Sequence, residues 1–76
     1  MEGKVKVTVV IEKDEFGYYA YCPELKGCHS QGDTLEEVLK NIKEAIELYL
    51  ETLDEEERKL LLNKEILATS LEINLA

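Results

Sequence analysis

The strongest constraint on the fold is one long amphipathic helix pattern, which runs from Leu35 to Leu53. Apolar residues recur there at intervals of three and four, so they line one helix face for about five turns. Thr34 and Glu37 fit a capping box at its start. A single helix of this kind must bury its apolar face against a second layer, and 76 residues hold only one small domain. We therefore expect one domain over residues 1–76.

Strand patterns precede the helix. From Lys4 to Lys13, valine and isoleucine alternate with mostly polar residues, which indicates a half-buried strand. The turn residues Asp14–Gly17 and the strand formers Tyr18–Cys22 then predict a hairpin. Pro23 ends the second strand, and a further turn leads to a short third strand over Cys28–Gln31. These strands predict an antiparallel meander.

The pattern after the main helix is mixed. The acidic run Asp54–Glu57 and the Leu-rich stretch Arg58–Leu67 favour a second helix, and the alternation over Thr69–Leu75 predicts a fourth strand. The expected class is α+β, a two-layer sandwich in which one main helix covers one face of an antiparallel sheet. The sheet has three to four strands, in the order β-β-β-α-(α)-β.

The charge balance narrows the classes of function. Nine Lys and Arg against 17 Asp and Glu give a net charge of −8, which argues against direct nucleic acid binding and favours a basic protein partner. No apolar run approaches the roughly 20 residues that a membrane span needs. The first residues lack a secretion signal pattern, so a cytoplasmic location is the expectation.

The inventory for catalysis is poor. His29 is the only histidine, and its neighbours Cys28 and Ser30 point to the opposite face of a strand. A pair of Cys22 and His29 across a hairpin is the remaining nucleophile arrangement. The acids near strand ends, which are Glu12, Asp14 and Glu24, indicate a metal-dependent nuclease only weakly. We expect no enzymatic activity, no metal and no cofactor.

The cysteines and tyrosines leave two questions open. Cys22 and Cys28 flank a tight turn closely enough to bridge, although free thiols are favoured in a reducing cytosol. Tyr19 and Tyr21 share the strand face opposite Tyr18. Either they form an exposed interface, or they are cross-strand pairs that simply cover the sheet.

A longer motif carries a resemblance. Residues 17–37 read GYYAYCPELKGCHSQGDTLEE, and residues 41–46 read NIKEAI. Together they resemble the HicB-like antitoxin family, whose hallmark is a G-Y-x-A-x-x-P-E-L-x-G-C pattern, a later G-x-T-x-x-E and an N-I-x-E-A-I-type helix. The resemblance covers residues 4 to 53.

This resemblance implies a partially degraded RNase H-like fold without nuclease activity. It also implies that the chain neutralises HicA, a small basic toxin that cleaves mRNA, by covering its active site. The motif residues take structural roles: Gly17, Gly27 and Gly32 as turn glycines, Pro23 in a rigid connection, Cys28 within the motif, and Thr34 with Glu37 as the helix cap. For the toxin-facing surface we expect Tyr19, Tyr21 and Glu24, from exposure and charge.

Many HicB antitoxins carry a C-terminal DNA-binding domain, and residues 54–76 are too short and too acidic for one. We therefore expect no separate DNA-binding domain. Small size and exposed sheet edges predict a homo-oligomer. The alternatives are an orphan HicB-like oligomeric module without a toxin, and a small enzyme that uses the Cys/His pair or residual carboxylates.

Overall fold

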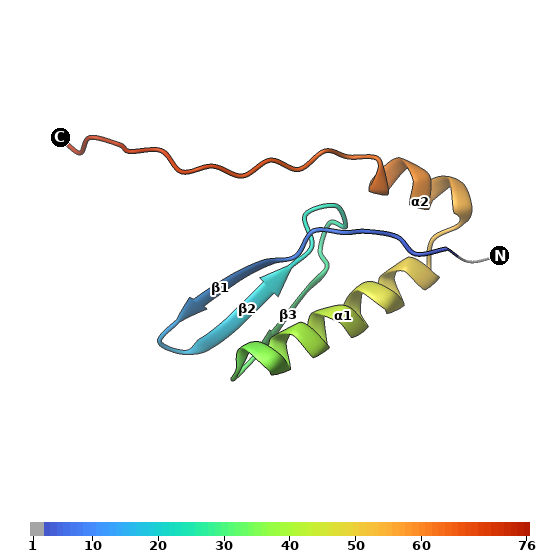
Figure 1. Ribbon diagram of the computed structural model, residues 1–76, viewed down its shortest axis with the longest axis horizontal. Helices are drawn as coiled ribbons and strands as arrows, with labels where there is room; N and C mark the ends of the chain where they lie inside the picture. The colour runs from blue at the N-terminus through green and yellow to red at the C-terminus, as the bar shows by residue number, and fades with distance from the viewer. Residues whose placement is uncertain (1–2) are drawn as a thin grey trace.

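The chain folds into a three-stranded sheet and two helices. The computed structural model describes residues 3–76, in the order β1 (Val10–Asp14), β2 (Gly17–Tyr21), β3 (His29–Gly32), α1 (Leu35–Glu51) and α2 (Glu55–Leu62). Residues 1 and 2 of the expected domain lie outside the described residues. The sheet is antiparallel with the order β1-β2-β3, and α1 lies against one side of it (Figure 1). The α+β class and the helix-on-sheet layers are confirmed.

The strand register fixes which side chains share a face. Tyr21 pairs with Val10 and His29, and Tyr19 pairs with Glu12 and Gln31. Because side chains alternate along a strand, these six lie on the face that α1 does not cover, which we call the open face. Ala20 points the other way, toward α1, and is fully buried.

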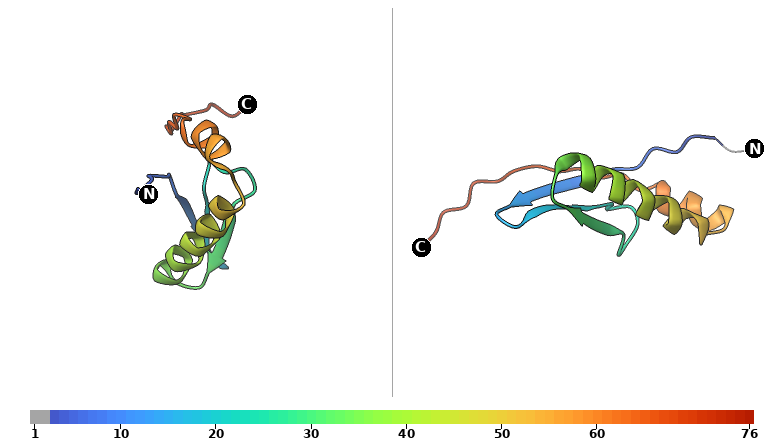
Figure 2. Two further views of the ribbon diagram at one scale, coloured as in Figure 1. Left: turned by 90° about the vertical axis from the view of Figure 1, so that its right-hand side faces the viewer. Right: turned by 90° about the horizontal axis from the view of Figure 1, so that it is seen from below.

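The core lies between the sheet and α1. Its buried apolar members are Ala20, Cys22, Leu25 and Cys28 from β2 and the following loop, and Val38, Ile42 and Ile46 from α1. The helix pattern is thus confirmed, but Leu35 and Leu39 on the predicted apolar face remain exposed. The reason is that α1 packs on β3 and β2 and not over β1 (Figure 2).

The first strand is shorter than expected. The alternation from Lys4 to Lys13 predicts a strand over the whole stretch, whereas pairing begins at Val10 because β2 ends at its partner Tyr21. Residues 3–9, which we call the N-terminal extension, continue from β1 as an extended trace (Figure 1). The alternation is correct, but β2 offers no strand beyond Tyr21 to pair with.

Both helix starts follow the expected capping chemistry. Thr34 Oγ1 accepts from the Glu37 amide at 3.0 Å, and the Glu37 carboxylate accepts from the amide of Asp33. At α2, Asp54 and Glu57 form a complete capping box, which explains why this helix begins in the acidic run. The second helix was expected through Leu67 and ends at Leu62, because the chain leaves the core there.

The expected fourth strand over Thr69–Leu75 is wrong for this structure. Residues 64–76, which we call the tail, start at α2 and run back in the direction of β1 without joining the sheet and without regular secondary structure (Figure 1). A strand requires a neighbour to satisfy its amides and carbonyls, and residues 64–76 pair with neither edge of the three-stranded sheet. The alternating pattern is present, but its partner strand is missing.

Glycine is required at the three motif positions for different physical reasons. Gly17 and Gly27 adopt positive φ angles of 134° and 83°, as turn glycines do. Gly32 does not: it ends β3, and a Cβ there would lie 2.7 Å from the Val38 amide nitrogen. The expectation of a turn role for Gly32 is wrong, because this glycine is required for the close approach of β3 to α1.

Replacing Gly32 by alanine should therefore force β3 and α1 apart. We expect Gly32→Ala to lower the free energy of unfolding by about 1–3 kcal/mol, the usual cost of overpacking. Urea unfolding followed by circular dichroism measures the change. Gly3→Ala is the control, since nothing lies within 4 Å of the added Cβ. Equal stability of the two variants would contradict the steric role.

Candidate functional site

The loop between β2 and β3 is built from two consecutive turns. The Leu25 amide donates to the Cys22 carbonyl and the Cys28 amide donates to the Leu25 carbonyl, both at 3.0 Å. Pro23 and Gly27 occupy the second and third positions of these turns, where a fixed φ and a positive φ are favoured. The Cys22 amide donates to the Cys28 carbonyl at 3.0 Å and closes the neck of the loop.

Glu24 joins this loop to the N-terminal extension. Its side chain is only 6% exposed, and its carboxylate accepts from the Thr8 amide at 3.0 and 3.2 Å and from the Thr8 hydroxyl at 2.9 Å. The Cys22 thiol donates to it at 3.6 Å. The expectation that Glu24 is exposed is therefore wrong, because this carboxylate is satisfied inside the fold.

These hydrogen bonds also set the charge state of Glu24. Burial on its own raises the pKa of the carboxyl, but its own amide, the Thr8 hydroxyl and amide, and the Cys22 thiol together hold the pKa below its ordinary value of 4.5. Glu24 is ionised at neutral pH. Its lowered pKa stabilises the fold above about pH 4.5, and this stabilisation is lost as the pH falls through the lower folded value.

We expect Glu24→Gln to lower the free energy of unfolding at pH 7 by about 1–3 kcal/mol, since the amide leaves part of the Thr8 bonding unmade. The variant should also lose less stability than the wild type between about pH 4.5 and pH 2. Urea unfolding across this pH range measures both effects. Glu44→Gln, at an exposed position of α1, is the control. An unchanged pH profile in the Glu24 variant would refute the assignment.

The two cysteines are free and buried. Burial and then the neighbouring Glu24 carboxylate raise the pKa of the Cys22 thiol to about 11, and burial raises the pKa of Cys28. Thiols of this kind are weak nucleophiles at neutral pH. His29 packs against Tyr19 on the open face, and the Cys22 thiol donates to Glu24 instead of to His29, although Cys22, Cys28 and His29 line the same hollow.

This environment predicts slow alkylation. A pKa raised from 9.0 to about 11 lowers the thiolate fraction of Cys22 about 100-fold. With iodoacetamide at pH 7.5, the native protein should react at least that much more slowly at Cys22 than the urea-unfolded chain, as measured by mass spectrometry. Comparable rates in the two states would show that Cys22 is exposed and activated instead.

The open face carries an aromatic cluster. The Tyr19 ring lies 6.0 Å from the Tyr21 ring and 5.7 Å from the His29 ring, measured between centroids. We call these three residues the aromatic face. Tyr19 is 39% exposed and His29 is exposed, so the cluster is both a cross-strand packing unit and an accessible surface.

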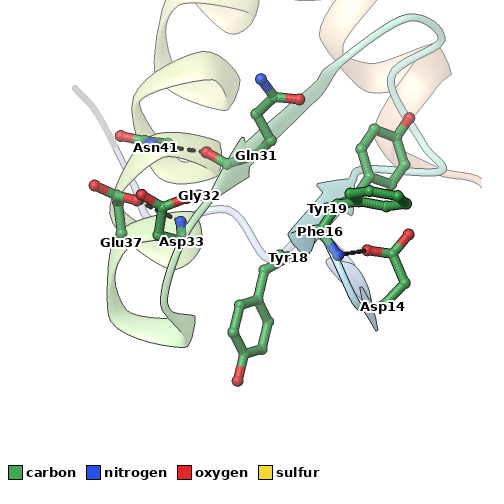
Figure 3. A pocket seen from close by; sticks show the side chains of 10 residues that line it. Asp14, Phe16, Tyr18, Tyr19, Gln31, Gly32, Asp33, Glu37 and Asn41 are labelled. Carbon is green, nitrogen blue, oxygen red and sulfur yellow. Dashed lines mark hydrogen bonds between the residues drawn. The ribbon is translucent and has the colours of Figure 1, made fainter.

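Two hollows flank the aromatic face, and Tyr19 lines both. One, of about 450 Å³, lies at the hairpin end of the sheet and carries the acids Asp14, Asp33 and Glu37 (Figure 3). The other, of about 370 Å³, lies beside the β2–β3 loop and is lined by Tyr21 and Pro23 among others. Figure 3 shows Tyr18 and Tyr19 leaving β2 on different sides.

The hollow that carries Asp14, Asp33 and Glu37, which we call the acidic hollow, has hydrogen bonds between residues of its lining. Asp14 accepts from the Phe16 amide at 2.8 Å, and Asn41 of α1 donates to the Gln31 carbonyl at 2.8 Å, which ties the exposed edge of β3 to the helix (Figure 3). Within residues 3–76, no group of three or more His, Cys, Asp or Glu is arranged to hold a metal ion. The carboxylates of Asp14, Asp33 and Glu37 give this hollow negative charge at the surface.

The structure separates the three residues expected to face a toxin. Tyr19 and Tyr21 lie together on the open face, whereas Glu24 is buried against Thr8. From the sequence, His29 was considered only as a catalytic group, and its packing against the Tyr19 ring was not predicted. The register of β2 against β3 was the missing signal, since it places His29 opposite Tyr21.

Fold and site define a small two-layer α+β domain whose open sheet face presents aromatic side chains beside an acidic hollow. The chain belongs to the HicB-like antitoxin family of bacterial toxin-antitoxin systems, whose family model matches residues 7–73. Membership supports an antitoxin role, implies a toxin partner in general and suggests a non-enzymatic role. Among residues 3–76, no helix is long and apolar enough to cross a membrane.

The chain is also similar in sequence to several curated proteins. A UPF0150 protein of Helicobacter pylori is 53% identical over 70 residues, which cover 92% of this chain and 97% of that protein. A UPF0150 protein of Synechocystis is 66% identical over 47 residues, which cover 60% of each chain. One from Archaeoglobus fulgidus is 56% identical over 48 residues, 62% of this chain and 70% of that protein. No solved structure matches significantly.

Proposed function

We propose that this protein is an antitoxin that binds a small basic HicA-type ribonuclease and covers its active site. The observation that carries the proposal is the aromatic face in a member of this family, exposed on the open side of the sheet and adjoining the acidic hollow. Tyrosine is enriched in protein interfaces because its ring offers apolar area and its hydroxyl a hydrogen bond.

Electrostatics favour the same partner. The segment from Glu36 to Glu57 holds nine acids against two lysines, so most of the net charge of −8 arises on the outer side of α1 and in α2. Glu12 shares the open face with Tyr19, and Asp14 lines the adjacent hollow. A basic ribonuclease that approaches this surface is steered by long-range attraction and meets carboxylates beside the tyrosines.

Glu24 contributes to this surface indirectly. Its bonds to Thr8 hold the loop that begins directly after Tyr21, and the Tyr49 hydroxyl fixes the same loop from the other side by donating to the Lys26 carbonyl at 3.0 Å. We therefore include Tyr19 and Tyr21 in the toxin-binding surface as contact residues and Glu24 as a positioning residue.

The remaining parts of the proposal follow the family resemblance. The β-β-β-α order is the one expected of a partially degraded RNase H-like fold that keeps no nuclease site. We infer a cytoplasmic homo-oligomer that does not bind nucleic acid directly, since the surface charge is strongly negative.

The test is co-expression with a HicA-type toxin encoded beside the gene for this chain. We expect relief of growth arrest and co-purification of the two proteins. The double variant Tyr19→Ala, Tyr21→Ala should raise the dissociation constant about 30-fold or more, since interface tyrosines at hot spots contribute about 2 kcal/mol. Isothermal titration calorimetry with purified toxin measures this change.

Leu48→Ala is the matched control, because Leu48 is a large exposed apolar residue on α1, away from the sheet. Circular dichroism verifies that each variant is folded. Failure to form a complex would refute the antitoxin function, whereas wild-type affinity in the tyrosine variant would refute the aromatic face as the interface.

A further inference from the structure

The tail is an exposed strand pattern without a strand partner. Apolar side chains occupy every second position apart from Thr69, and they are 72–93% exposed: Leu67, Leu71, Ile73 and Leu75. The opposite side of the tail carries Ser70, Glu72 and Asn74. This is the pattern of a half-buried strand, and a soluble protein rarely leaves such a run of large apolar residues in water.

The overall dimensions show how far the tail departs from the domain. The radius of gyration is 14.7 Å, against about 11 Å for a compact domain of this length, and the longest dimension is 52 Å. In Figure 1 the tail leaves from α2 and runs beside the sheet without joining it. The tail therefore buries none of its apolar side in its own domain.

The same domain carries an unfilled apolar groove of about 670 Å³ between the N-terminal extension and α1. It exists because α1 packs over β3 and β2 and leaves the inner side of the extension uncovered. We call it the edge groove, and its apolar lining includes Val5, Val7, Val9, Leu39, Ile42 and Ile46.

The backbone beside the edge groove is suited to accept a strand. The Thr8 amide points toward Glu24, and amide directions alternate along an extended chain, so the amides of Val7 and Val9 point outward. Among residues 3–76, no backbone hydrogen bond outside the regular elements involves the extension. A strand laid here would pair with the extension and place one row of side chains in the edge groove.

We propose that the edge groove binds the tail of a second copy of this chain, so that two copies exchange their tails in a closed symmetric dimer. This rests on the homo-oligomer in the proposed function and names its interface. The 13 tail residues reach about 43 Å when extended, more than the roughly 23 Å of the seven-residue extension. Their apolar row fills the edge groove, and their polar row stays at the surface.

A second copy is the fitting occupant because the chain's own tail stays exposed, although α2 ends beside the N-terminal extension. Leu61 and Leu62 of α2 pack against the core, and Arg58 Nε donates to the Leu50 carbonyl at 3.1 Å, which holds α2 at the end of α1. The tail thus leaves its own domain with its apolar row uncovered. In a reciprocal exchange each tail fills the groove of the other copy, so that neither a tail nor a groove remains exposed in the dimer.

The exchange leaves the toxin-binding surface free. The added strand lies at the β1 edge, and its apolar row points to the α1 side of the sheet. The aromatic face lies on β2 and β3 on the other side. Dimer formation and toxin binding therefore use separate surfaces.

Sedimentation equilibrium over a dilution series tests the proposal with the full chain. We expect a mass twice the 8.7 kDa of one chain. The double variant Leu71→Glu, Ile73→Glu should raise the dimer dissociation constant at least 100-fold. The matched control Ser70→Glu, Asn74→Glu adds the same charge to the polar row and should remain dimeric. A monomeric wild type, or a dimer that survives the Leu71 and Ile73 changes, would overturn the proposal.

Two further measurements identify the exchange itself. Hydrogen exchange by NMR should be at least 100-fold slower at the Val7 and Val9 amides in the wild type than in the Leu71/Ile73 variant. Mixing Leu39→Cys protein with Ile73→Cys protein should give a disulfide-linked dimer after mild oxidation, because the two thiols meet only between copies. Absence of both signals would overturn the tail-exchange interface. Toxin binding by the Leu71/Ile73 variant reports separately on the proposed function.

Discussion

The fold depends on one buried carboxylate. The Glu24 carboxylate accepts hydrogen bonds from the amide and from the hydroxyl of Thr8, and the two residues are 16 positions apart in the chain. This contact replaces the pairing that β2 would otherwise supply beyond Tyr21, so it keeps the N-terminal extension in line with β1. The same contact restrains the loop that follows the aromatic face. Both proposed binding surfaces, the aromatic face on one side and the edge groove on the other, are therefore positioned through Glu24.

The distribution of charge keeps the acids of the two helices out of the core. These acids lie at exposed positions, where they repel each other weakly through water, and those in the first turns of α1 and α2 favour the helix N-termini. Arg58 supplies the positive group that the last turn of α1 lacks, because its guanidinium donates to the Leu50 carbonyl. The surplus negative charge thus lies on the surface, where it can act on a partner.

Local patterns predicted the elements, and long-range contacts decided their extent. The helix over Leu35–Glu51 and the hairpin follow from periodicity, caps and turn residues close together in the chain. The start of β1 at Val10 could not be predicted, because it depends on its partner β2 ending at Tyr21, before Pro23. The burial of Glu24 depends on Thr8, and the separation of Tyr19 from Tyr18 follows from alternation alone. For this reason the sequence correctly placed the tyrosines and misplaced the glutamate.

The tail shows where a strand pattern and a strand differ. Alternation over Thr69–Leu75 specifies which side chains seek an apolar surface, but it does not specify on which molecule that surface lies. Within one chain, the apolar side chains of the tail stay exposed and the tail joins no strand, so the pattern has no partner there. In the proposed dimer, the apolar row of the tail fills the groove of the other copy, and the tail is long enough to span it. A domain of this size has little core of its own. Exchange of tails would extend that core across two copies. The apolar row of the tail would then be buried in the dimer, although it is exposed in the single domain.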